Sequence, residues 1–339
     1  MLSLSYKLIR GGPVMKAIIV KQPGGAEQLQ VKEQPKPVPK DDQLLIKVKA
    51  TAINRTDIIN RKSSSGYLDN PILGIEVAGI VEEAGAGSAV AVGTRVMGLV
   101  NGGGYAEYAV MPAERAMVIP ENLSFEEAAA IPEVFLTAFQ TLFWIGQLDK
   151  DETVLIHAGG SGVGTAAIQL AKELGHAKVI TTAGSKEKLD FCESLGADHG
   201  INYKEQDFDK EVLHATNEQG VDLILDFIGA SYWRKNFTSI KVDGRWVLIG
   251  LLGGAEIEQF NLMDVMSKRI QLTGTLLTPR SDPYKAALTA DFAGKTMELF
   301  AKDKLKPIVD QVFPFEQVQQ AHEHMESNKN IGKIILKVD

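Results

Sequence analysis

The stretch HAGGSGVGTAAIQLAK, residues 157–172, decides the fold that this chain is expected to adopt. It follows the strand-like run ETVLIHA and leads into the helix-like run TAAIQLAK, so Gly159 and Gly164 bracket a turn between a strand and a helix. A glycine-rich turn of this kind presents backbone N–H groups and a helix N-terminus to a pyrophosphate. The stretch therefore predicts a dinucleotide-binding site.

One position of the turn departs from the dinucleotide fingerprint. Aligned with G-x-G-x-x-G, Gly159 is the first glycine and Gly164 the third, while Ser161 takes the place of the second. That position normally has no side chain, so that the phosphate can approach the backbone closely. Serine is the smallest polar replacement, and its hydroxyl is able to donate to a phosphate or to reach toward a nicotinamide ring. Glycine turns also arise from packing alone, so the turn is a weak signal by itself.

The sequence around the turn alternates strands and helices. The strand runs are unbroken stretches of leucine and β-branched residues, as in strands that a parallel sheet buries on both faces. The alternating runs are ETVLIHA, TAAIQLAKELG, AKVITTAG, SKEKLDFCESLG, VDLILDFIG and RWVLIGLLGG. We therefore predict an α/β fold in which residues 128–274 form a Rossmann domain with a doubly wound parallel sheet.

The region before this domain has a different pattern. From Met15 onward, short strand-like runs are closely punctuated by glycine and proline, as in a small β-barrel or sandwich. Ser124 and Glu127 have the spacing of a capping box, so a helix should begin there. The tail contains one helix and a last strand, IGKIILKV, which we expect to pair with the N-terminal strands. Residues 15–127 and 275–339 are therefore predicted to form one catalytic domain.

Residues 1–14 are excluded from the fold prediction, because they precede a second methionine, Met15, at which the strand MKAIIV begins. They contain Lys7 and Arg10 but no acidic residue. We interpret them as a leader or N-terminal extension, and an organelle-targeting segment is the alternative.

Composition narrows the class of protein. A chain of 339 residues, 45% hydrophobic and 23% charged, fits a two-domain globular enzyme or binding protein. The net charge of -7 argues against a nucleic-acid-binding surface, and no apolar run reaches the roughly 20 residues that span a bilayer. Cys192 is the single cysteine, so no intramolecular disulfide can form. We expect a reducing, cytoplasmic compartment and a structural thiol.

The end of the second Rossmann strand bears on the choice of cofactor. An NAD-preferring domain carries an Asp or Glu there, which holds the ribose 2′-hydroxyl. Here the run KVITTAG ends at Gly184 and Ser185 without a carboxylate, and Lys186 and Lys188 follow. Cations at this place favour a 2′-phosphate and hence NADPH. The alternative is that Ser185 only caps the next helix and that the lysines form a solvated first turn.

The sequence lacks the ligands of the zinc sites that many alcohol dehydrogenases use. No histidine and no cysteine precedes His157. His322 and His324 are two residues apart in a helix, so their rings point to different faces, and we interpret both as surface residues. A chain without zinc ligands suits the reduction of an electrophilic conjugated acceptor, such as a quinone or an enone, better than alcohol oxidation.

Dispersed motifs resemble one family. The runs NRTD, DETVLIHAGGSGVGTAAIQLAK, GADHGINYKEQDF and NKNIGKIIL resemble the zinc-free quinone oxidoreductase, or zeta-crystallin-like, branch of the medium-chain dehydrogenase/reductase superfamily. Within that branch, AAAIPEVFLTAFQTL, SYW and DGRWVLIGLLGG most resemble the tumour-suppressor-inducible quinone oxidoreductases. The resemblance implies a GroES-like β-barrel catalytic domain, a Rossmann domain, NADPH and a homodimer.

The resemblance also implies roles for single residues. It implies that Asn54 and Thr137 lie near the nicotinamide and its ribose, that Asn328 lies beside the cofactor, and that Tyr67 contributes to the quinone site. The pyrophosphate would meet Ser161, Gly162, Val163 and Gly164, and the 2′-phosphate would meet Gly184, Ser185, Lys188 and Tyr203. Tyr67, Ser161 and Asn54 are thus the catalytic candidates. Where zinc-binding relatives carry G-H-E, this chain has Gly74, Ile75 and Glu76.

Several of these residues also have ordinary structural explanations. Asn54 suits a turn, Thr137 a helix interior, and Tyr203 a packing position after the third strand. Tyr105 and Tyr108 are interpreted as barrel packing.

The sequence therefore predicts a zinc-independent, NADPH-dependent reductase that transfers hydride to a small-molecule quinone. The alternatives are an enoyl or 2-alkenal reductase, which uses the same hydride geometry, and a non-catalytic NADPH-binding protein.

Overall fold

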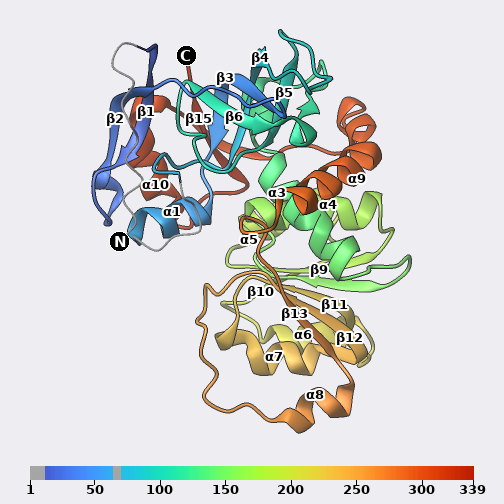
Figure 1. Ribbon diagram of the computed structural model, residues 1–339. Helices are drawn as coiled ribbons and strands as arrows, with labels where there is room; N and C mark the ends of the chain where they lie inside the picture. The colour runs from blue at the N-terminus through green and yellow to red at the C-terminus, as the bar shows by residue number, and fades with distance from the viewer. Residues whose placement is uncertain (1–11, 64–69) are drawn as a thin grey trace. The chain divides into compact units, whose positions relative to one another are not determined.

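The computed structural model describes residues 12–63 and 70–339 of the chain (Figure 1). Contacts divide the chain into two compact units. The first unit runs to Glu133 and takes up Gln311–Lys329 and Ile334–Asp339. The second unit comprises Val134–Asp310 and Asn330–Lys333. Within the described part of the chain, no helix combines the length and the apolar character that crossing a membrane requires.

The first unit contains the predicted β-rich region. An antiparallel hairpin is formed by β1 (Val14–Val20) and β2 (Leu29–Pro35). A second sheet has the order β14-β15-β3-β4-β5-β7, with β6 also paired to β3. Its strands are β3 (Gln43–Ala52), β4 (Glu76–Ala84), β5 (Arg95–Leu99), β6 (Tyr108–Pro112), β7 (Met117–Val118), β14 (Val309–Pro314) and β15 (Lys333–Lys337). The last strand, β15, pairs antiparallel with β3, as expected from the sequence.

Alternation along β3 builds the core of this unit. Leu44, Ile46 and Val48 are all buried and belong to one apolar cluster, to which Val77 of β4 and Val96 of β5 contribute. Burying side chains of this size stabilises a fold by about 1.5–3 kcal/mol each. The two-residue period of the sequence thus produces a closed apolar interior.

Short helices complete the first unit. The capping box predicted from the sequence is confirmed, because the Ser124 hydroxyl accepts the N–H of Glu127 at 3.2 Å and the Glu127 carboxylate accepts the N–H of Ser124 at 2.9 Å. Helix α1 lies where the sequence pattern indicated only strands and turns. The helical segments are η1 (Ala26–Gln28), α1 (Arg55–Lys62), η2 (Ala113–Arg115), α2 (Phe125–Ala129), η5 (Phe315–Gln317) and α10 (Val318–Glu326).

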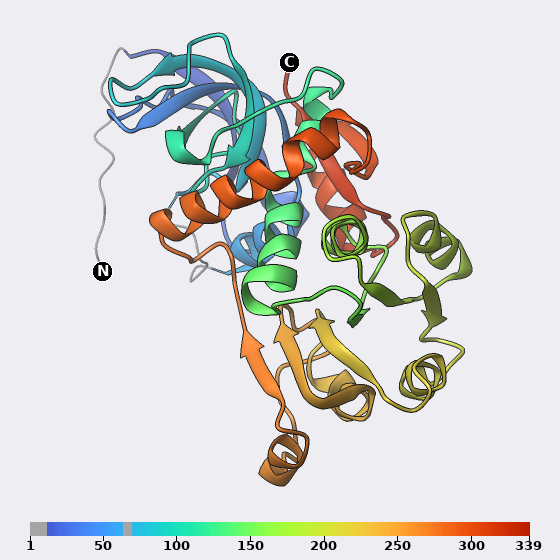
Figure 2. The same cartoon turned by 90° about the vertical axis from the view of Figure 1, so that its right-hand side faces the viewer.

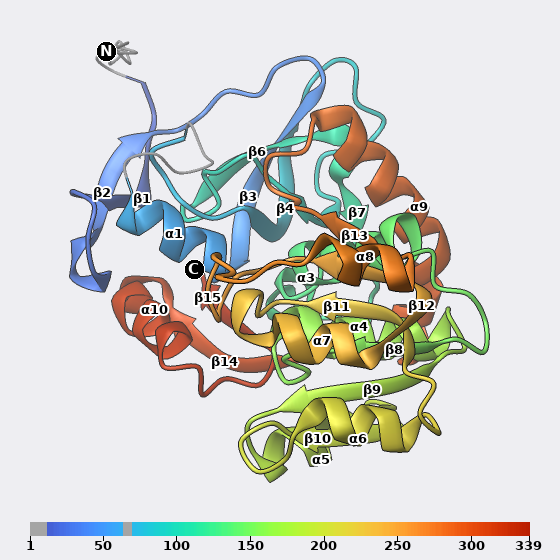
Figure 3. The same cartoon turned by 90° about the horizontal axis from the view of Figure 1, so that it is seen from below.

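The second unit contains the Rossmann-type parallel sheet that the sequence predicted, but the unit extends past residue 274 to Asp310, so helix α9 belongs to it and not to the first unit as expected. Its six strands are parallel and have the order β10-β9-β8-β11-β12-β13, which is the doubly wound order (Figure 3). Helices α4 and α5 cover one face of this sheet, and α6 and α7 cover the other (Figure 2). The strands are β8 (Thr153–Ile156), β9 (Lys178–Ala183), β10 (His199–Asn202), β11 (Val221–Asp226), β12 (Ile240–Leu248) and β13 (Gln271–Gly274).

The helices of this unit include a π-helical segment. Helix α3 continues directly into η3, whose hydrogen bonds are of the π type. Phe135 and Phe139 of this helix pack against Phe300 and Phe292 of α9, with ring centroids 5.0 and 5.6 Å apart. The segments are α3 (Pro132–Phe139), η3 (Gln140–Ile145), α4 (Gly162–Glu173), α5 (Lys186–Ser194), α6 (Phe208–Ala215), η4 (Ala230–Tyr232), α7 (Trp233–Ser239), α8 (Leu262–Lys268) and α9 (Asp282–Ala301).

The sheet has an exposed edge at β13, a strand that the sequence pattern did not reveal. All four residues of β13 are exposed, and Leu262, Met263 and Met266 of the preceding helix α8 are also exposed. An open edge beside apolar side chains is the kind of surface that proteins use for association. The homodimer implied by the family resemblance stays a prediction.

The close approach of α4 to β8 leads to a stability prediction. A side-chain carbon on Gly164 would lie 2.4 Å from the carbonyl oxygen of Ala158 and 2.7 Å from that of Gly159, and both are backbone atoms. We expect Gly164→Ala to lower the free energy of unfolding by about 1–3 kcal/mol, because the helix must move away from the strand. The measurement is urea denaturation.

Gly294, in the interior of α9, provides the matched control. A carbon there would meet nothing within 4 Å, so Gly294→Ala should raise the free energy of unfolding by about 0.5–1 kcal/mol. Equal effects of the two substitutions would contradict the close approach of α4 to β8.

Candidate functional site

The glycine turn of the second unit lies between two lysine side chains. A carbon on Gly160 would meet Cδ of Lys188 at 3.1 Å, and a carbon on Gly162 would meet Cδ of Lys333 at 2.9 Å. The hydrocarbon stems of these lysines therefore occupy the space that side chains at 160 and 162 would fill. Packing within the protein already favours glycine at both positions.

Ser161 is the N-cap residue of α4. Its backbone is extended, with φ −75° and ψ 167°, and its hydroxyl oxygen accepts the N–H of Gly164 at 3.0 Å. A capping oxygen keeps its own proton available to a further acceptor. The N–H of Val163, in the same first turn, meets no acceptor among the described residues. The start of α4 thus presents hydrogen-bond donors and the positive end of a helix dipole.

A segment near the C-terminus lies against the glycine turn, although the sequence did not predict this. The N–H of Gly332 donates to the carbonyl of Gly160 at 3.0 Å, and Gly332 forms a parallel bridge with Ser161. The ammonium of Lys188 donates to the carbonyl of Asn330 at 3.0 Å. The run NKNIGKIIL signals this segment in the sequence, but nothing in that run indicates which turn it contacts.

The tip of β9 is the second part of this site. Ser185 caps α5, since its hydroxyl accepts the N–H of Lys188 at 3.3 Å, so the capping explanation of this serine is confirmed. Lys186 and Lys188, which follow Ser185 in the first turn of α5, differ in burial. Lys186 is exposed and pairs with Asp190 at 2.6 Å, whereas Lys188 is half-buried, and this burial lowers its pKa. Lys188 is therefore less solvated than Lys186 in the same helix turn.

Tyr203 lies beside the same strand tip. A carbon on Gly184 would lie 2.7 Å from the Tyr203 hydroxyl, and the side chain of Tyr203 is 44% exposed. The N–H of Tyr203 donates to the carbonyl of Ala183 at 3.2 Å, which anchors the chain after β10 to the end of β9. The phenol hydroxyl is thus directed over the glycine that ends the strand.

A buried polar network lies beneath the turn. The Nδ1 and Nε2 atoms of His157 lie 2.9 Å from the Thr182 hydroxyl and 2.6 Å from the Asn236 amide oxygen. The Asn236 amide donates in turn to Asp226 at 3.1 Å. Burial lowers the pKa of His157, so the ring is neutral. It donates through Nε2 and accepts through Nδ1, which fixes the strand ends that carry the site.

In the first unit, Asn54 is the N-cap residue of α1 and forms a capping box with Asp57. Its side-chain amide donates to Glu76 at 2.7 Å, and its backbone N–H donates to Asp57 at 2.8 Å. The second carboxylate oxygen of Glu76 accepts the N–H of Glu133 at 2.7 Å. Beside Glu76, Ile75 is buried and apolar.

His322 corrects one interpretation from the sequence, because it is fully buried rather than a surface residue. The Arg61 guanidinium donates to its Nδ1 at 3.0 Å, and its Nε2 lies 3.1 Å from the Tyr105 hydroxyl. Nδ1 accepts from a cation, so Nε2 carries the ring proton. Arg61 also pairs with Glu326 at 2.9 Å. The partners of the His322 ring, Arg61 and Tyr105, are 261 and 217 residues away in sequence. The residues next to His322 in the sequence therefore do not indicate that it is buried.

Two of the remaining candidate residues, Thr137 and Asn328, belong to different units. Thr137 is buried in α3 of the second unit. Asn328 belongs to the first unit, has φ +58°, and accepts a hydrogen bond from Arg55 through its side-chain oxygen. Tyr67 lies outside the described residues. Tyr105 is buried in the barrel core, in agreement with the packing interpretation, and Cys192 is buried, with a pKa that burial raises to about 12.

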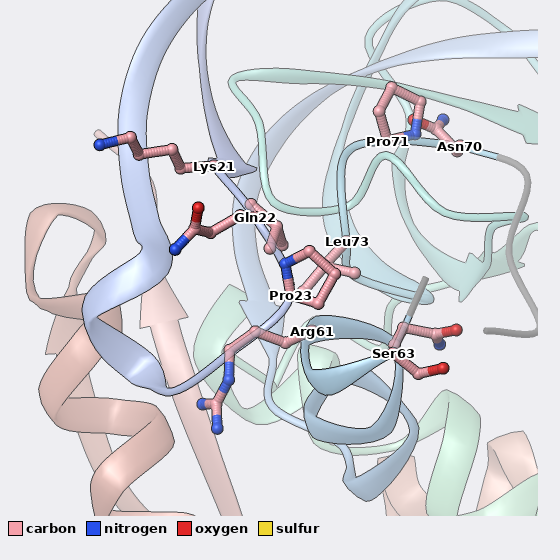
Figure 4. A pocket seen from close by; sticks show the side chains of 10 residues that line it. Lys21, Gln22, Pro23, Arg61, Ser63, Asn70, Pro71 and Leu73 are labelled. Carbon is pink, nitrogen blue, oxygen red and sulfur yellow. The ribbon is translucent and has the colours of Figure 1, made fainter. Parts of the chain in front are cut away.

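The first unit also contains a pocket with a volume of about 290 Å³ (Figure 4). Polar and apolar side chains from the end of β1, from α1 and from the chain before β4 line it, among them Lys21, Pro23, Ser63 and Leu73. Arg61 contributes to the wall, but its guanidinium is engaged with Gly24, His322 and Glu326. We assign no ligand to this pocket.

Among residues 12–63 and 70–339, no group of three or more His, Cys, Asp or Glu side chains is placed to hold a metal ion.

Comparisons with known proteins place the chain in a family. The family model described as alcohol dehydrogenase GroES-like domain matches residues 40–121, and the one described as zinc-binding dehydrogenase matches residues 162–292. Human quinone oxidoreductase is 32% identical over 335 residues, which cover 96% of this chain and 98% of that protein.

Solved structures agree with this assignment. An NAD-dependent alcohol dehydrogenase has a TM-score of 0.86 at 32% identity, and a mycobacterial protein complexed with NADPH has a TM-score of 0.86 at 28% identity. Each comparison covers 96% of this chain and 100% of the other. The chain therefore belongs to the medium-chain dehydrogenase/reductase superfamily. Over nearly its whole length it is similar to the quinone oxidoreductases of that superfamily, which makes it an oxidoreductase that uses a nicotinamide cofactor.

The buried His322 predicts an acid-dependent loss of stability. Burial and the nearby Arg61 lower the pKa of His322 to about 3, whereas the ordinary value is near 6.5. As the pH falls from about 6.5 toward 3, the unfolded chain takes up a proton that the folded chain does not, so stability falls. We expect His322→Gln to reduce the pH dependence of the unfolding free energy in this window by up to about 1.4 kcal/mol per pH unit.

The measurement is denaturant unfolding at several pH values. His214→Gln, at an exposed position on α6, is the control and should leave the slope unchanged. Parallel curves for the wild-type chain and His322→Gln would show that His322 titrates normally in the folded protein.

Proposed function

We propose that this protein is an NADPH-dependent reductase that transfers hydride to quinones without a metal ion. The observation that carries the cofactor choice is the tip of β9, where Gly184 and Ser185 replace the usual carboxylate and where Lys188 and the Tyr203 hydroxyl lie nearby. The similarity to human quinone oxidoreductase over nearly the whole chain supports the substrate class.

The second unit fits the phosphates of a dinucleotide. The first turn of α4 presents the N–H of Val163 and the hydroxyl of Ser161, and helix α4 directs its positive end to the same place. The proposed pyrophosphate contacts are Gly159, Ser161, Gly162, Val163 and Gly164. Lys188, in the first turn of the helix that follows the strand tip, and the Tyr203 phenol hydroxyl suit a 2′-phosphate better than a 2′-hydroxyl, because an ammonium and a phenol hydroxyl both donate hydrogen bonds.

Each unit has its own part in the proposed reaction. A bound nicotinamide would supply the hydride, and the first turn of α4 in the second unit would hold the phosphates of the cofactor. In the first unit, Asn54 is kept rigid by Asp57 and Glu76, so its orientation is set before any ligand binds. A quinone is already electrophilic and needs only hydrogen-bond donors for the developing oxyanion. Asn54, Thr137, Asn328 and Tyr67 stay predicted contributors.

The decisive experiment is stopped-flow oxidation of NADPH and NADH with a panel of quinones and 2-alkenals. We expect turnover of quinones and a preference for NADPH. In Lys188→Ala that preference should fall by about tenfold or more, because a charge-assisted phosphate contact is lost. NADH turnover should change little.

Other outcomes assign other functions. Fast turnover of 2-alkenals with inert quinones would identify an enoyl or alkenal reductase. NADPH binding without oxidation by any acceptor would identify a binding protein. Equal affinities for NADPH and NADH in the wild-type chain would contradict the interpretation of the strand tip.

Ser161 provides a separate test of the glycine turn. Glycine is a helix cap only a few tenths of a kcal/mol weaker than serine, so Ser161→Gly removes the hydroxyl with little loss of stability. If the hydroxyl donates to the cofactor, NADPH affinity and turnover should fall several-fold, equivalent to about 0.5–1.5 kcal/mol. Ser161→Val should reduce both far more, because its methyl groups block the approach of the pyrophosphate.

Ser281→Gly is the matched control. Ser281 caps α9 in the same unit, its hydroxyl accepting the N–H of Tyr284 at 3.4 Å, so this variant loses a similar cap away from the turn. Normal binding and turnover by Ser161→Val would mean that the turn does not hold the cofactor.

A further inference from the structure

A chain of buried hydrogen bonds connects the last turn of α1 to its first turn by way of α10 and Tyr105. The Arg61 guanidinium donates to Nδ1 of His322 at 3.0 Å, and Nε2 of His322 lies 3.1 Å from the Tyr105 hydroxyl. The Tyr105 hydroxyl is hydrogen-bonded in turn to the carboxylate of Asp57, in the first turn of α1. All four side chains are buried and belong to the first unit.

The direction of each hydrogen bond in this chain follows from the groups that can only donate or only accept. A guanidinium only donates, so Nδ1 of His322 accepts and Nε2 carries the ring proton. Nε2 therefore donates to the Tyr105 oxygen, and the Tyr105 proton goes to Asp57, whose ionised carboxylate only accepts. Burial and the charge of Asp57 raise the pKa of Tyr105, so the phenol keeps the proton that it donates.

Asp57 joins two segments of the first unit. Its Oδ2 accepts the N–H of Asn54 at 2.8 Å, and its Oδ1 accepts the N–H of Gly74 at 3.0 Å. The Cβ–Cγ torsion of an aspartate is soft, so the carboxylate plane can turn while both oxygens stay near these N–H groups. A third hydrogen bond, from Tyr105, fixes that plane and with it the position of the Asn54 backbone.

Tyr105 is itself held firmly in place. Its N–H donates to the carbonyl of Leu73 at 2.9 Å, and its carbonyl accepts the N–H of Ile18 at 2.8 Å. A carbon on Gly74 would lie 2.5 Å from Cδ1 of the Tyr105 ring, so the ring packs directly on the backbone of Gly74. The hydroxyl therefore reaches Asp57 from a fixed place.

We propose that Tyr105 is a positioning residue for Asn54 and that it acts through Asp57. This inference rests on the proposed function, in which Asn54 is a predicted contributor to the reaction. Asp57 holds the backbone of Asn54, and Glu76 accepts from its side-chain amide at 2.7 Å. A buried polar network whose hydrogen bonds are all made specifies one geometry. His322 takes part by directing the Tyr105 proton toward Asp57.

The test measures the single-turnover rate of hydride transfer from NADPH to the quinone or 2-alkenal that the wild-type chain reduces fastest, and separately the affinity for NADPH. Tyr105→Phe removes only the hydroxyl. We expect a rate about tenfold lower, because a small misplacement in a site slows the reaction. The affinity for NADPH should stay the same, since the proposed phosphate contacts belong to the second unit. Tyr108→Phe, the same substitution on a half-buried tyrosine of β6, should keep the wild-type rate.

A double-mutant cycle with Asn54→Ala separates positioning from support of the fold. If Tyr105 acts through Asn54, Tyr105→Phe lowers the rate only while Asn54 is present, so the double variant should be no slower than Asn54→Ala alone. Val96→Ala removes apolar side chain from the cluster that also contains Tyr105, and it should lower stability without lowering the rate. Should Tyr105→Phe fail to fold, His322→Leu takes its place in the cycle, because it removes the donor that directs the Tyr105 proton.

The outcomes separate this inference from the proposed function. If Tyr105→Phe lowers the rate no more than Val96→Ala does, or lowers it equally with and without Asn54, Tyr105 only supports the fold and the inference is wrong, while the reductase function stands. A wild-type rate in Asn54→Ala would contradict the role of Asn54 and the inference together. Absence of hydride transfer to every quinone and 2-alkenal by the wild-type chain would contradict the proposed function, and the inference would fail with it.

Discussion

Helix α4 begins so close to the end of β8 that no side chain fits between them. The carbonyl oxygens of Ala158 and Gly159 occupy the space in which a carbon on Gly164 would lie. This contact sets where the first turn of the helix emerges, and therefore where the N–H of Val163 and the hydroxyl of Ser161 point. Because the sheet is parallel and in register, β9 and β10 end at the same edge as β8. The glycine turn, Gly184 and Tyr203 are consequently neighbours, although more than 40 residues of chain separate the first from the last.

The parts of the fold that local pattern governs could be predicted from the sequence. Unbroken apolar runs such as VLI at residues 154–156 indicate strands buried on both faces, and the six-stranded parallel sheet follows from their alternation with helices. The capping pair Ser124 and Glu127 was predictable because both partners lie within one helical turn. Strand β13 was missed because its four residues are exposed and carry no such pattern.

The contacts that could not be predicted join residues far apart in sequence. Neither the position of Gly332 against Gly160 nor the burial of His322 between Arg61 and Tyr105 has a local signature. A histidine in a helix rich in Gln and Glu looks exposed until the partner that covers it is known. The candidate site likewise has one feature that the sequence reveals and one that only the fold reveals. The missing acid at the end of β9 is visible in the sequence, whereas the approach of the Tyr203 hydroxyl to Gly184 depends on the register of β9 and β10.

The route of the chain near its C-terminus has a consequence for the order of folding. Asn330–Lys333 belong to the second unit, whereas the residues on either side belong to the first. Strand β15, which begins at Lys333, lies between β14 and β3 and is therefore an interior strand of its sheet. During synthesis from the N-terminus, all six strands of the parallel sheet have been made once Gly274 is added, while the first unit still lacks this interior strand. The barrel that is synthesised first is therefore completed last, and a chain that ends before Asn330 would lose an interior strand of a sheet rather than a tail.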